Sequence, residues 1–322
     1  MPSNTRPLIR KPLVRLADVR VMRHVPTVPF RHSAREPRPN RSRVAFVLSG
    51  GGNQAVAQVG MLRALIEREI TPDVVIGTSA GALNAVAVAA SPTLAGVAQL
   101  ANVWGELSGG EVFPGGRLSR AWNVVRRGTY LFDSAGLDGL IDRATRARTF
   151  DDLAVPLRVI ATDLDSGEEV VLASGPLKPA LLASTALPGV FPIVAHDGRR
   201  LVDGGVVDAV PLWHALSSAV DVVYVMNVSS TGHDRPLRSP LDVVMTSFAH
   251  SRNLRFELEL RHAPPEVEIV VLPRPRDVRD LFDFSGSETL IDEAHRLACA
   301  VLDDREPVVP DRARVFRRFR SA

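Results

Sequence analysis

The chain has 322 residues, of which 45% are hydrophobic, and this is enough to bury one substantial core. Its formal net charge of +3 hides an asymmetry, because residues 1–43 carry +9 and the remaining residues carry −6. Cys299 is the single cysteine, which excludes an intrachain disulfide and a zinc site built from several cysteines, and fits a reducing, cytoplasmic compartment.

Residues 1–42 form a basic N-terminal arm with scattered prolines and no uninterrupted apolar stretch. This composition excludes a secretory signal peptide and predicts disorder. The arm has two interpretations: a peripheral contact with an anionic membrane, or a solvated tail, which is the commoner role of basic tails. Nucleic-acid binding would depend on the arm alone and is not expected. A second basic tail, residues 306–322, leaves residues 43–305 as the predicted folded domain.

The folded part begins with two units of strand, glycine-rich turn and helix. Val44–Leu48 is a short apolar run that stops at glycine, as a buried parallel strand would, and Ala55–Arg68 has apolar residues at helical spacing. The order repeats with a strand at Val74–Ile76 and an alanine-rich helix at Ala82–Ala90. Two such units in succession predict a parallel sheet with right-handed crossovers.

The rest of the chain continues to alternate between helices and strands, after a middle stretch that contains glycine and proline. The pattern predicts helices at Leu137–Arg148, Ala180–Ala186, Leu241–Leu260 and Ser287–Asp303, and strands at Leu157–Thr162, Glu169–Ala173, Asp221–Asn227 and Glu268–Leu272. The expected fold class is therefore α/β.

A run of three glycines, residues 50–52, separates the first strand from the first helix, so the backbone there closely approaches another group. The sequence GGGNQA fits the relaxed dinucleotide pattern G-x-G-x-x-A, but the second strand ends in Gly77-Thr78-Ser79 and lacks the acidic residue which that pattern needs. A Walker-type phosphate loop needs a lysine after the glycines, and Lys11 and Lys178 are the only lysines. The oxyanion of an ester is the remaining candidate.

The sequence GTSAG, residues 77–81, has the G-x-S-x-G form of a nucleophile elbow, in which flanking glycines permit the strained turn that presents a serine hydroxyl. The alternative is a glycine-rich turn in which Ser79 caps the following helix. Two glycine turns at the carboxyl ends of successive parallel strands open on the same edge of the sheet. One turn can then supply a nucleophile and the other backbone N–H donors for an oxyanion.

A third glycine-containing turn occurs in LVDGGVVDAVP, where Asp203 follows an apolar pair and precedes two glycines. An ordinary Asp-Gly β-turn would give the same local pattern. Taken together, the triple glycine, GTSAG and DGG resemble the patatin-like phospholipase family, and the resemblance extends from about Arg43 to Val301.

The resemblance implies a three-layer α/β/α fold with a mostly parallel central sheet, and a lipid acyl hydrolase of the esterase or phospholipase A type. It implies that Ser79 is the nucleophile and Asp203 the base of a Ser–Asp dyad, and that Gly50, Gly51 and Gly52 form the oxyanion loop. It also implies a lipid or phospholipid acyl ester as substrate, with no cofactor and no metal ion.

The chain departs from the family pattern directly after the glycines. The family usually has Gly-Gly-Gly-x-Arg-Gly, whereas this chain continues with Asn53, Gln54 and Ala55. A neutral Gln54 donates hydrogen bonds but cannot compensate the charge of a phosphate. We therefore expect neutral lipid esters or thioesters as substrates in preference to lipids with charged headgroups.

Two other functions are compatible with the same residues. A Ser–His–Asp hydrolase would need one of the histidines that follow both Ser79 and Asp203, namely His214, His233, His250, His262 or His295. A catalytically silent lipid-binding or regulatory protein would keep the fold without the chemistry. The altered glycine loop favours the silent protein, and the presence of both Ser79 and Asp203 argues against it.

Overall fold

The computed structural model describes residues 41–113, 128–229, 240–276 and 283–304. The predicted arm, apart from its last two residues, and the predicted C-terminal tail lie outside these ranges, as does His233. The domain limits at residues 43 and 305 therefore stay predictions. None of the described helices has both the length and the apolar character needed to cross a lipid bilayer.

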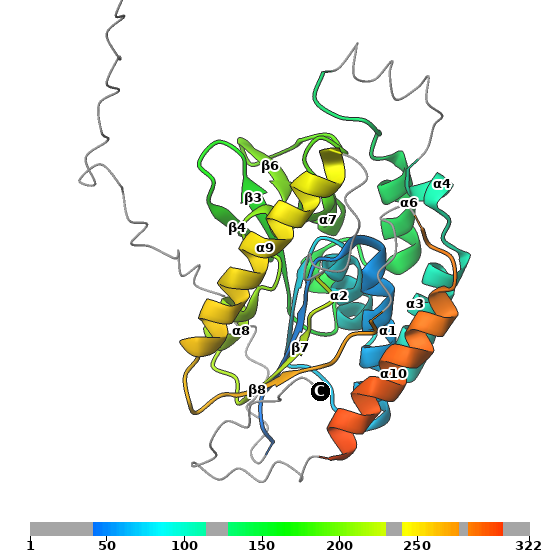
Figure 1. Cartoon of the computed structure of the whole chain (residues 1–322), viewed down its shortest axis with the longest axis vertical. Helices are drawn as coiled ribbons and strands as arrows, with labels where there is room; N and C mark the ends of the chain where they lie inside the picture. The colour runs from blue at the N-terminus through cyan, green and yellow to red at the C-terminus, as the bar shows by residue number, and fades with distance from the viewer. Residues whose placement is uncertain (1–40, 114–127, 230–239, 277–282, 305–322) are drawn as a thin grey trace, which may run out of the picture. The chain divides into compact units, whose positions relative to one another are not determined.

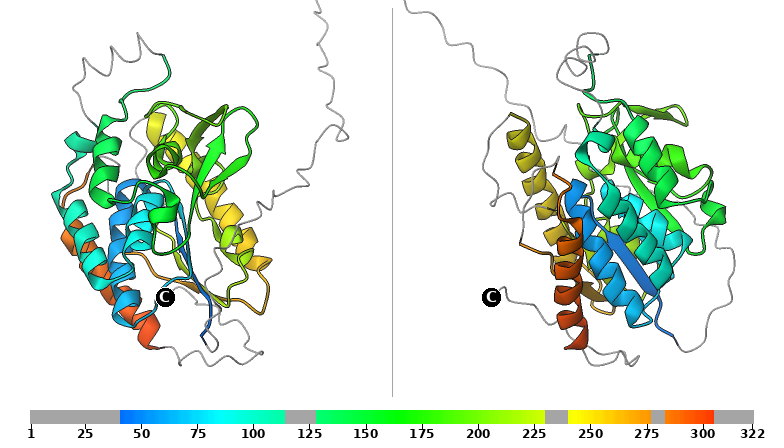
Figure 2. Two further views of the ribbon diagram at one scale, coloured as in Figure 1. Left: turned by 180° about the vertical axis from the view of Figure 1, so that it is seen from behind. Right: turned by 90° about the vertical axis from the view of Figure 1, so that its right-hand side faces the viewer.

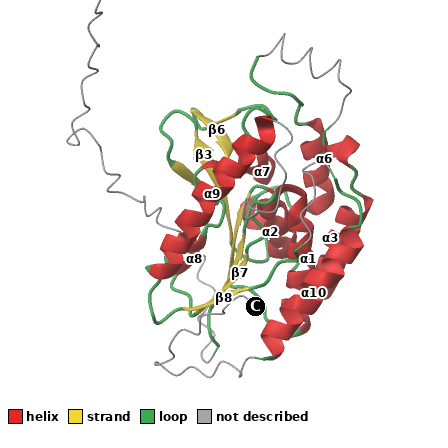
Figure 3. Ribbon diagram, in the orientation of Figure 1, coloured by secondary structure: helices red, strands yellow, loops and turns green. Residues whose placement is uncertain are grey.

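A central sheet with the strand order β5-β6-β3-β2-β1-β7-β8 organises the described residues, and β4 pairs with β3 beside this path (Figures 1 and 3). Its parallel part consists of β1 (Val44–Leu48), β2 (Val74–Thr78), β3 (Leu157–Asp163), β7 (Val222–Met226) and β8 (Glu268–Val271). The antiparallel part consists of β4 (Glu169–Leu172) and β6 (Arg199–Asp203), which both pair with β3, and of β5 (Val194–His196), which pairs with β6. The predicted, mostly parallel sheet is confirmed.

Helices cover both faces of the sheet, as Figure 2 shows from two sides. On one face, alternate residues of β1 such as Phe46 pack into a core with α1 (Val56–Glu67), α2 (Ala80–Ala90), α3 (Leu94–Glu106), α6 (Ala135–Ala144), α7 (Leu177–Thr185) and α10 (Ser287–Asp303). On the other face, Val47 packs into a second core with α8 (Leu212–Leu216) and α9 (Pro240–Arg261). Burial of a strand on both faces explains the continuous apolar run of β1. The predicted three-layer α/β/α class is confirmed.

The predicted elements occur where the periodicity indicated them, with changes at their ends. Helix α6 ends before the predicted Arg148, because Thr145 adopts an extended conformation with φ −152° and ψ 149°. Helix α3 was not predicted, although its buried apolar residues recur at helical spacing and Thr93 caps it by accepting a hydrogen bond from the Gly96 N–H. The short α4 (Gly109–Val112), α8 and the β5–β6 hairpin were not predicted either. These three elements are too short to give a clear periodic signal.

Helices α1 and α10 pack closely at Gly60. A Cβ atom built on Gly60 would lie 2.0 Å from the carbonyl oxygen of Ile291 and 2.7 Å from the backbone nitrogen of His295. Only a residue without a side chain allows this approach. The contact fixes α1, and hence the glycine-rich turn that precedes it.

We predict that Gly60→Ala lowers the free energy of unfolding by about 1–3 kcal/mol, because the added methyl group forces the two helices apart. Gly139→Ala is a matched control, since Gly139 is an exposed position of α6 with nothing within 4 Å of a built Cβ atom. It should raise stability by about 0.5–1 kcal/mol. Urea unfolding of both variants provides the measurement, and an equal gain in stability would contradict the close packing.

Candidate active site

Strand β3 brings the ends of two other strands together. Ile160 pairs with Thr78, the last residue of β2, and the next residue, Ala161, pairs with Asp203, the last residue of β6. Ser79 therefore begins its turn next to the end of the strand that carries Asp203. The structure brings the predicted nucleophile and the predicted base together.

Ser79 occupies a strained turn between β2 and α2. Its φ is 55° and its ψ is −130°, a conformation that side chains rarely adopt. The turn is tight enough that a Cβ atom on Gly81 would lie 2.4 Å from the carbonyl oxygen of Ser49. The Ser79 N–H donates to the Ser184 hydroxyl at 2.9 Å, and this hydroxyl donates to the Ile160 carbonyl oxygen at 2.6 Å. Ser184, which was not predicted from the sequence, thus connects the turn at Ser79 to β3.

The Asp203 carboxylate is buried and accepts two hydrogen bonds. Its Oδ2 accepts from the Ser79 hydroxyl at 2.6 Å, and its Oδ1 accepts from the Gly205 N–H at 2.7 Å. Burial raises the pKa of Asp203 to about 6, although these two hydrogen bonds and the positive charge of Arg252 oppose the shift. A carboxylate with such a pKa can accept a proton near neutral pH.

The glycine-rich turn offers backbone donors beside Ser79, but not all three glycines are free. The Gly50 N–H donates to the Ala209 carbonyl oxygen at 2.9 Å and is therefore occupied. Within the part of the chain that the structure describes, the N–H groups of Gly51 and Gly52 have no hydrogen-bond partner, and both residues line the cavity at Ser79. Ala80 also lines it and, as the first residue of α2, has no partner inside the helix. Ala80 was not among the donors predicted from the sequence.

A buried polar chain holds the glycine-rich turn against the elbow helix. Trp104 donates from Nε1 to Asn84 Oδ1 at 2.8 Å, and Asn84 donates from Nδ2 to Gln58 Oε1 at 2.8 Å. Gln58 in turn donates to the carbonyl oxygens of Ser49 and Met226 at 2.9 and 3.0 Å. Helices α1, α2 and α3 and the ends of two strands are therefore connected beneath the turn.

The cavity at Ser79 has an apolar part and a polar part. The apolar part is lined by side chains from α2, α3 and α6 and by aromatic rings, among them Leu83, Trp104, Phe113, Leu140, Phe191 and Phe284. Phe113 and Phe191 stack with their ring centroids 5.6 Å apart. The polar part is lined by the glycine-rich turn and by residues of α9. Asp203 and Arg252 are the only charged side chains among the described residues that line the cavity.

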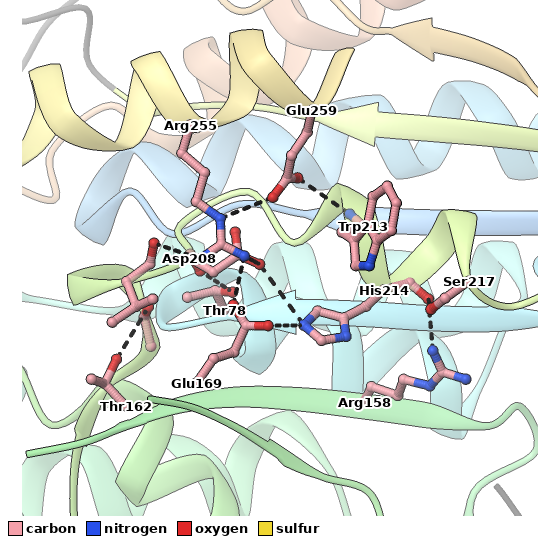
Figure 4. Close-up of polar contacts among 12 residues, drawn as sticks. Thr78, Arg158, Thr162, Glu169, Asp208, Trp213, His214, Ser217, Arg255 and Glu259 are labelled. Atoms are coloured by element: carbon pink, nitrogen blue, oxygen red, sulfur yellow. Dashed lines mark hydrogen bonds and ion pairs between the residues drawn. The ribbon is translucent and has the colours of Figure 1, made fainter. Parts of the chain in front are cut away.

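A second polar cluster lies beneath the turn that follows Asp203 (Figure 4). Arg255 of α9 contacts Glu169 Oε2 at 2.6 Å and Asp208 Oδ2 at 3.2 Å, and His214 Nε2 contacts Glu169 Oε1 at 2.7 Å. Burial disfavours the charge on Glu169, but His214 and Arg255 outweigh it and lower its pKa to about 2, whereas burial raises the pKa of Asp208.

This second cluster connects α9 to the elbow. Arg255 donates from Nη1 to the Val207 carbonyl oxygen at 3.1 Å, and the Thr78 hydroxyl donates to the Asp208 carbonyl oxygen at 3.0 Å. The three carboxylate and imidazole ligands of this cluster lie close enough together to hold a metal ion. The guanidinium of Arg255 already supplies positive charge there, so the cluster is explained as an anchor of α9.

Comparison with known proteins identifies the family. The patatin-like phospholipase family model matches residues 46–216, which include the glycine-rich turn, Ser79 and Asp203. The chain belongs to the patatin-like phospholipase family.

Two relatives illustrate the similarity. Patatin-like phospholipase domain-containing protein 7 of Rattus norvegicus is 31% identical over 189 residues, which cover 58% of this chain and 14% of that protein. Lysophospholipase NTE1 of Pyricularia oryzae is 26% identical over 198 residues, which cover 60% of this chain and 12% of that protein. The chain thus spans a small part of the length of the curated relatives it matches. The crystal structure of VipD from Legionella pneumophila aligns at 12% identity with a TM-score of 0.42, covering 82% of this chain and 67% of that one.

The glycine-rich turn of this chain departs from the usual family pattern at Gln54 and Ala55, which stand in place of arginine and glycine. Asn53 is buried, and its Nδ2 donates to the Asp283 carbonyl oxygen at 2.6 Å. Gln54 lines the cavity at the place in the sequence where the family usually has arginine. The glycine-rich turn is therefore held in place at Asn53 and carries no positive charge.

The described histidines lie away from Ser79. His214 contacts Glu169, His262 contacts the Leu258 carbonyl oxygen, and His295 contacts Glu67. His250 is exposed on α9. No described histidine lines the cavity, which leaves His233, outside the described ranges, as the one candidate that the structure does not locate.

We predict that Ser184→Ala lowers the free energy of unfolding by about 1–3 kcal/mol, because the partly buried N–H of Ser79 loses its acceptor. Ser247→Ala is the control: Ser247 is exposed on α9 and bonds only to the Val243 carbonyl oxygen of its own helix. A change within about 0.5 kcal/mol is expected there. Urea unfolding measures both, and equal effects would show that Ser184 does not support the elbow.

Proposed function

We propose that this protein is a serine acyl hydrolase that acts on lipid esters, with Ser79 as the nucleophile and Asp203 as the base. The observation that carries the proposal is the 2.6 Å hydrogen bond from the Ser79 hydroxyl to the buried Asp203 carboxylate, inside a cavity with one apolar part. Membership of the patatin-like phospholipase family supports the same reaction class.

The first half of the proposed reaction is the acylation of Ser79. Asp203 accepts the hydroxyl proton while Oγ attacks the ester carbonyl carbon, and the carbonyl oxygen becomes an oxyanion. The N–H groups of Gly51, Gly52 and Ala80 are the donors best placed to stabilise it, because they line the cavity without other partners among the described residues. The tetrahedral intermediate then expels the alcohol, which takes the proton from Asp203.

The second half is hydrolysis of the acyl-enzyme. Asp203 accepts a proton from a water molecule as the water oxygen attacks the acyl carbon, and the same donors stabilise the second oxyanion. Collapse of this intermediate breaks the bond to Ser79 Oγ, which regains its proton from Asp203, and the fatty acid leaves. These steps use side chains and backbone groups of the chain alone.

The apolar part of the cavity is suited to the acyl chain of the substrate. Its lining of leucine, tryptophan and phenylalanine side chains removes an alkyl chain from water, which contributes roughly 0.8 kcal/mol per buried methylene group. The polar part beside α9 then receives the alcohol portion of the ester. This orientation supports a lipid ester over a small polar ester.

We predict that Ser79→Ala and Asp203→Asn each lower kcat/KM for p-nitrophenyl octanoate by at least about 1,000-fold, and that the double variant is no worse than either single variant. Residues that act as one unit lose their effect together, which explains the lack of additivity. Labelling with an alkyl fluorophosphonate, followed by peptide mapping, should modify Ser79 in the wild type.

Ser247→Ala is the control for both assays, because this serine lies on the exposed face of α9 and should keep wild-type activity. Circular dichroism establishes that the inactive variants stay folded. Additive losses in the double variant would argue against a dyad. A folded wild type that neither reacts with the probe nor hydrolyses the ester would favour the silent lipid-binding protein.

We predict that kcat/KM rises with pH through an apparent pKa of about 6, because Asp203 accepts a proton only as the carboxylate and its pKa is about 6. Activity should therefore be lost as the pH falls below this value and should reach a plateau above about pH 7. The measurement is ester hydrolysis in a pH-stat, corrected for the rate without enzyme. A midpoint near the ordinary aspartate value of about 4 would contradict the role of the buried Asp203.

A further inference from the structure

Arg252 is the unexplained charged group of the cavity. It lies on α9, is partly buried, and lines the polar part of the cavity together with Ser79 and Asp203. Its Nε is buried without a hydrogen-bond partner, and its guanidinium forms no ion pair with any described residue. A buried donor that lacks an acceptor costs about 1–3 kcal/mol, so a group of this kind calls for an explanation.

The other arginines at this end of α9 are paired. Arg255 contacts Glu169, Asp208 and Glu259, and Arg261 contacts Glu257. Arg252 is the exception, although Asp203 is close enough to influence it electrostatically.

Arg252 lies against the turn that follows Asp203. A Cβ atom built on Gly205 would lie 3.0 Å from Asp203 Oδ1 and 3.2 Å from Arg252 Nη1, so glycine at this position leaves room for both groups. The cluster around Arg255 anchors α9 one helical turn further along (Figure 4). Arg252 thus lies beside the base, and it lines the cavity that contains Ser79.

We propose that Arg252 is a specificity-determining residue that binds an anionic phosphate in the alcohol portion of the substrate. This inference rests on the proposed function, and it replaces the expectation, drawn from Gln54, that neutral lipid esters are preferred. A guanidinium matches two oxygens of a phosphate at once, and the partly buried position strengthens this charge-assisted contact. The cation that the glycine-rich turn lacks would then come from α9.

The charges of the proposed reaction fit this role. In the resting site the negative charge of Asp203 partly balances Arg252. When Asp203 accepts the proton of Ser79, it becomes neutral, and the phosphate of the substrate remains as the counter-charge of Arg252. An ester without the phosphate would leave this guanidinium without a bound partner during the reaction.

Binding of octyl phosphate and octyl glucoside to the full chain tests the inference without requiring catalysis. Isothermal titration calorimetry below the critical micelle concentrations compares the wild type with Arg252→Gln. We expect octyl phosphate to bind the variant roughly 10- to 100-fold more weakly, and octyl glucoside to bind both proteins with affinities within about twofold. The affinity of Arg252→Lys for octyl phosphate should lie between the affinities of the wild type and of Arg252→Gln. The lysine variant also keeps the test valid if the glutamine variant does not fold.

Arg261→Gln is the matched control, since it removes the same charge from an exposed position of α9 outside the cavity lining. It should bind octyl phosphate like the wild type. Binding of inorganic phosphate tests whether the site takes a free anion instead of the phosphate of a lipid. We expect inorganic phosphate to bind much more weakly than octyl phosphate. Equal losses for the two octyl ligands, equal effects of the two glutamine variants, or equal affinities for inorganic and octyl phosphate would each overturn the inference.

Hydrolysis provides the second readout. The ratio of kcat/KM for lysophosphatidylglycerol to kcat/KM for a monoacylglycerol with the same acyl chain should fall roughly 10-fold or more in Arg252→Gln. An unchanged ratio would overturn the specificity role. A wild type that hydrolyses neither lipid but binds octyl phosphate through Arg252 would contradict the proposed function and leave the anion site supported.

Discussion

The pairing of β3 with both β2 and β6 is the constraint on which the candidate site depends. Neighbouring strands lie about 4.8 Å apart, and successive residues along a strand rise about 3.3 Å. Because Ile160 and Ala161 hold the ends of β2 and β6, little freedom is left in the distance between Ser79 and Asp203, which are joined by a 2.6 Å hydrogen bond. The junction between the parallel and antiparallel parts of the sheet is therefore also the place where the two reactive groups meet.

Polar groups buried on both sides of the sheet stabilise this junction. On one side, Gln58 and Asn84 connect the glycine-rich turn to the elbow helix. On the other, Arg255 neutralises part of the negative charge of Glu169 and Asp208. Removing one partner of such a cluster leaves the other charged groups buried and uncompensated. This costs more stability than replacing the whole cluster with apolar side chains would. The site is thus held by interactions between distant parts of the chain.

The sequence predicted those features that have a local signature. Glycines mark the turns around Ser79 and Asp203, and the apolar runs mark the parallel strands, so the α/β class followed from the pattern. The pairing of these two residues was implied by the resemblance to the family that carries the same three motifs. Arg252, Ser184 and Ala80 carry no local signal, because their importance comes from what the fold places beside them. The occupation of the Gly50 N–H by Ala209 depends in the same way on a contact between distant residues.

The conformation of Ser79 affects which substitutions at the candidate site would stabilise the protein. Its positive φ costs about 1–3 kcal/mol in a residue with a side chain, and glycine would remove that cost. Asp203 opposes stability as well, since burial disfavours its charged form. Substitution of these two residues would therefore raise stability while removing the proposed chemistry. The candidate site and the stability of the fold thus make opposite demands on the same two positions.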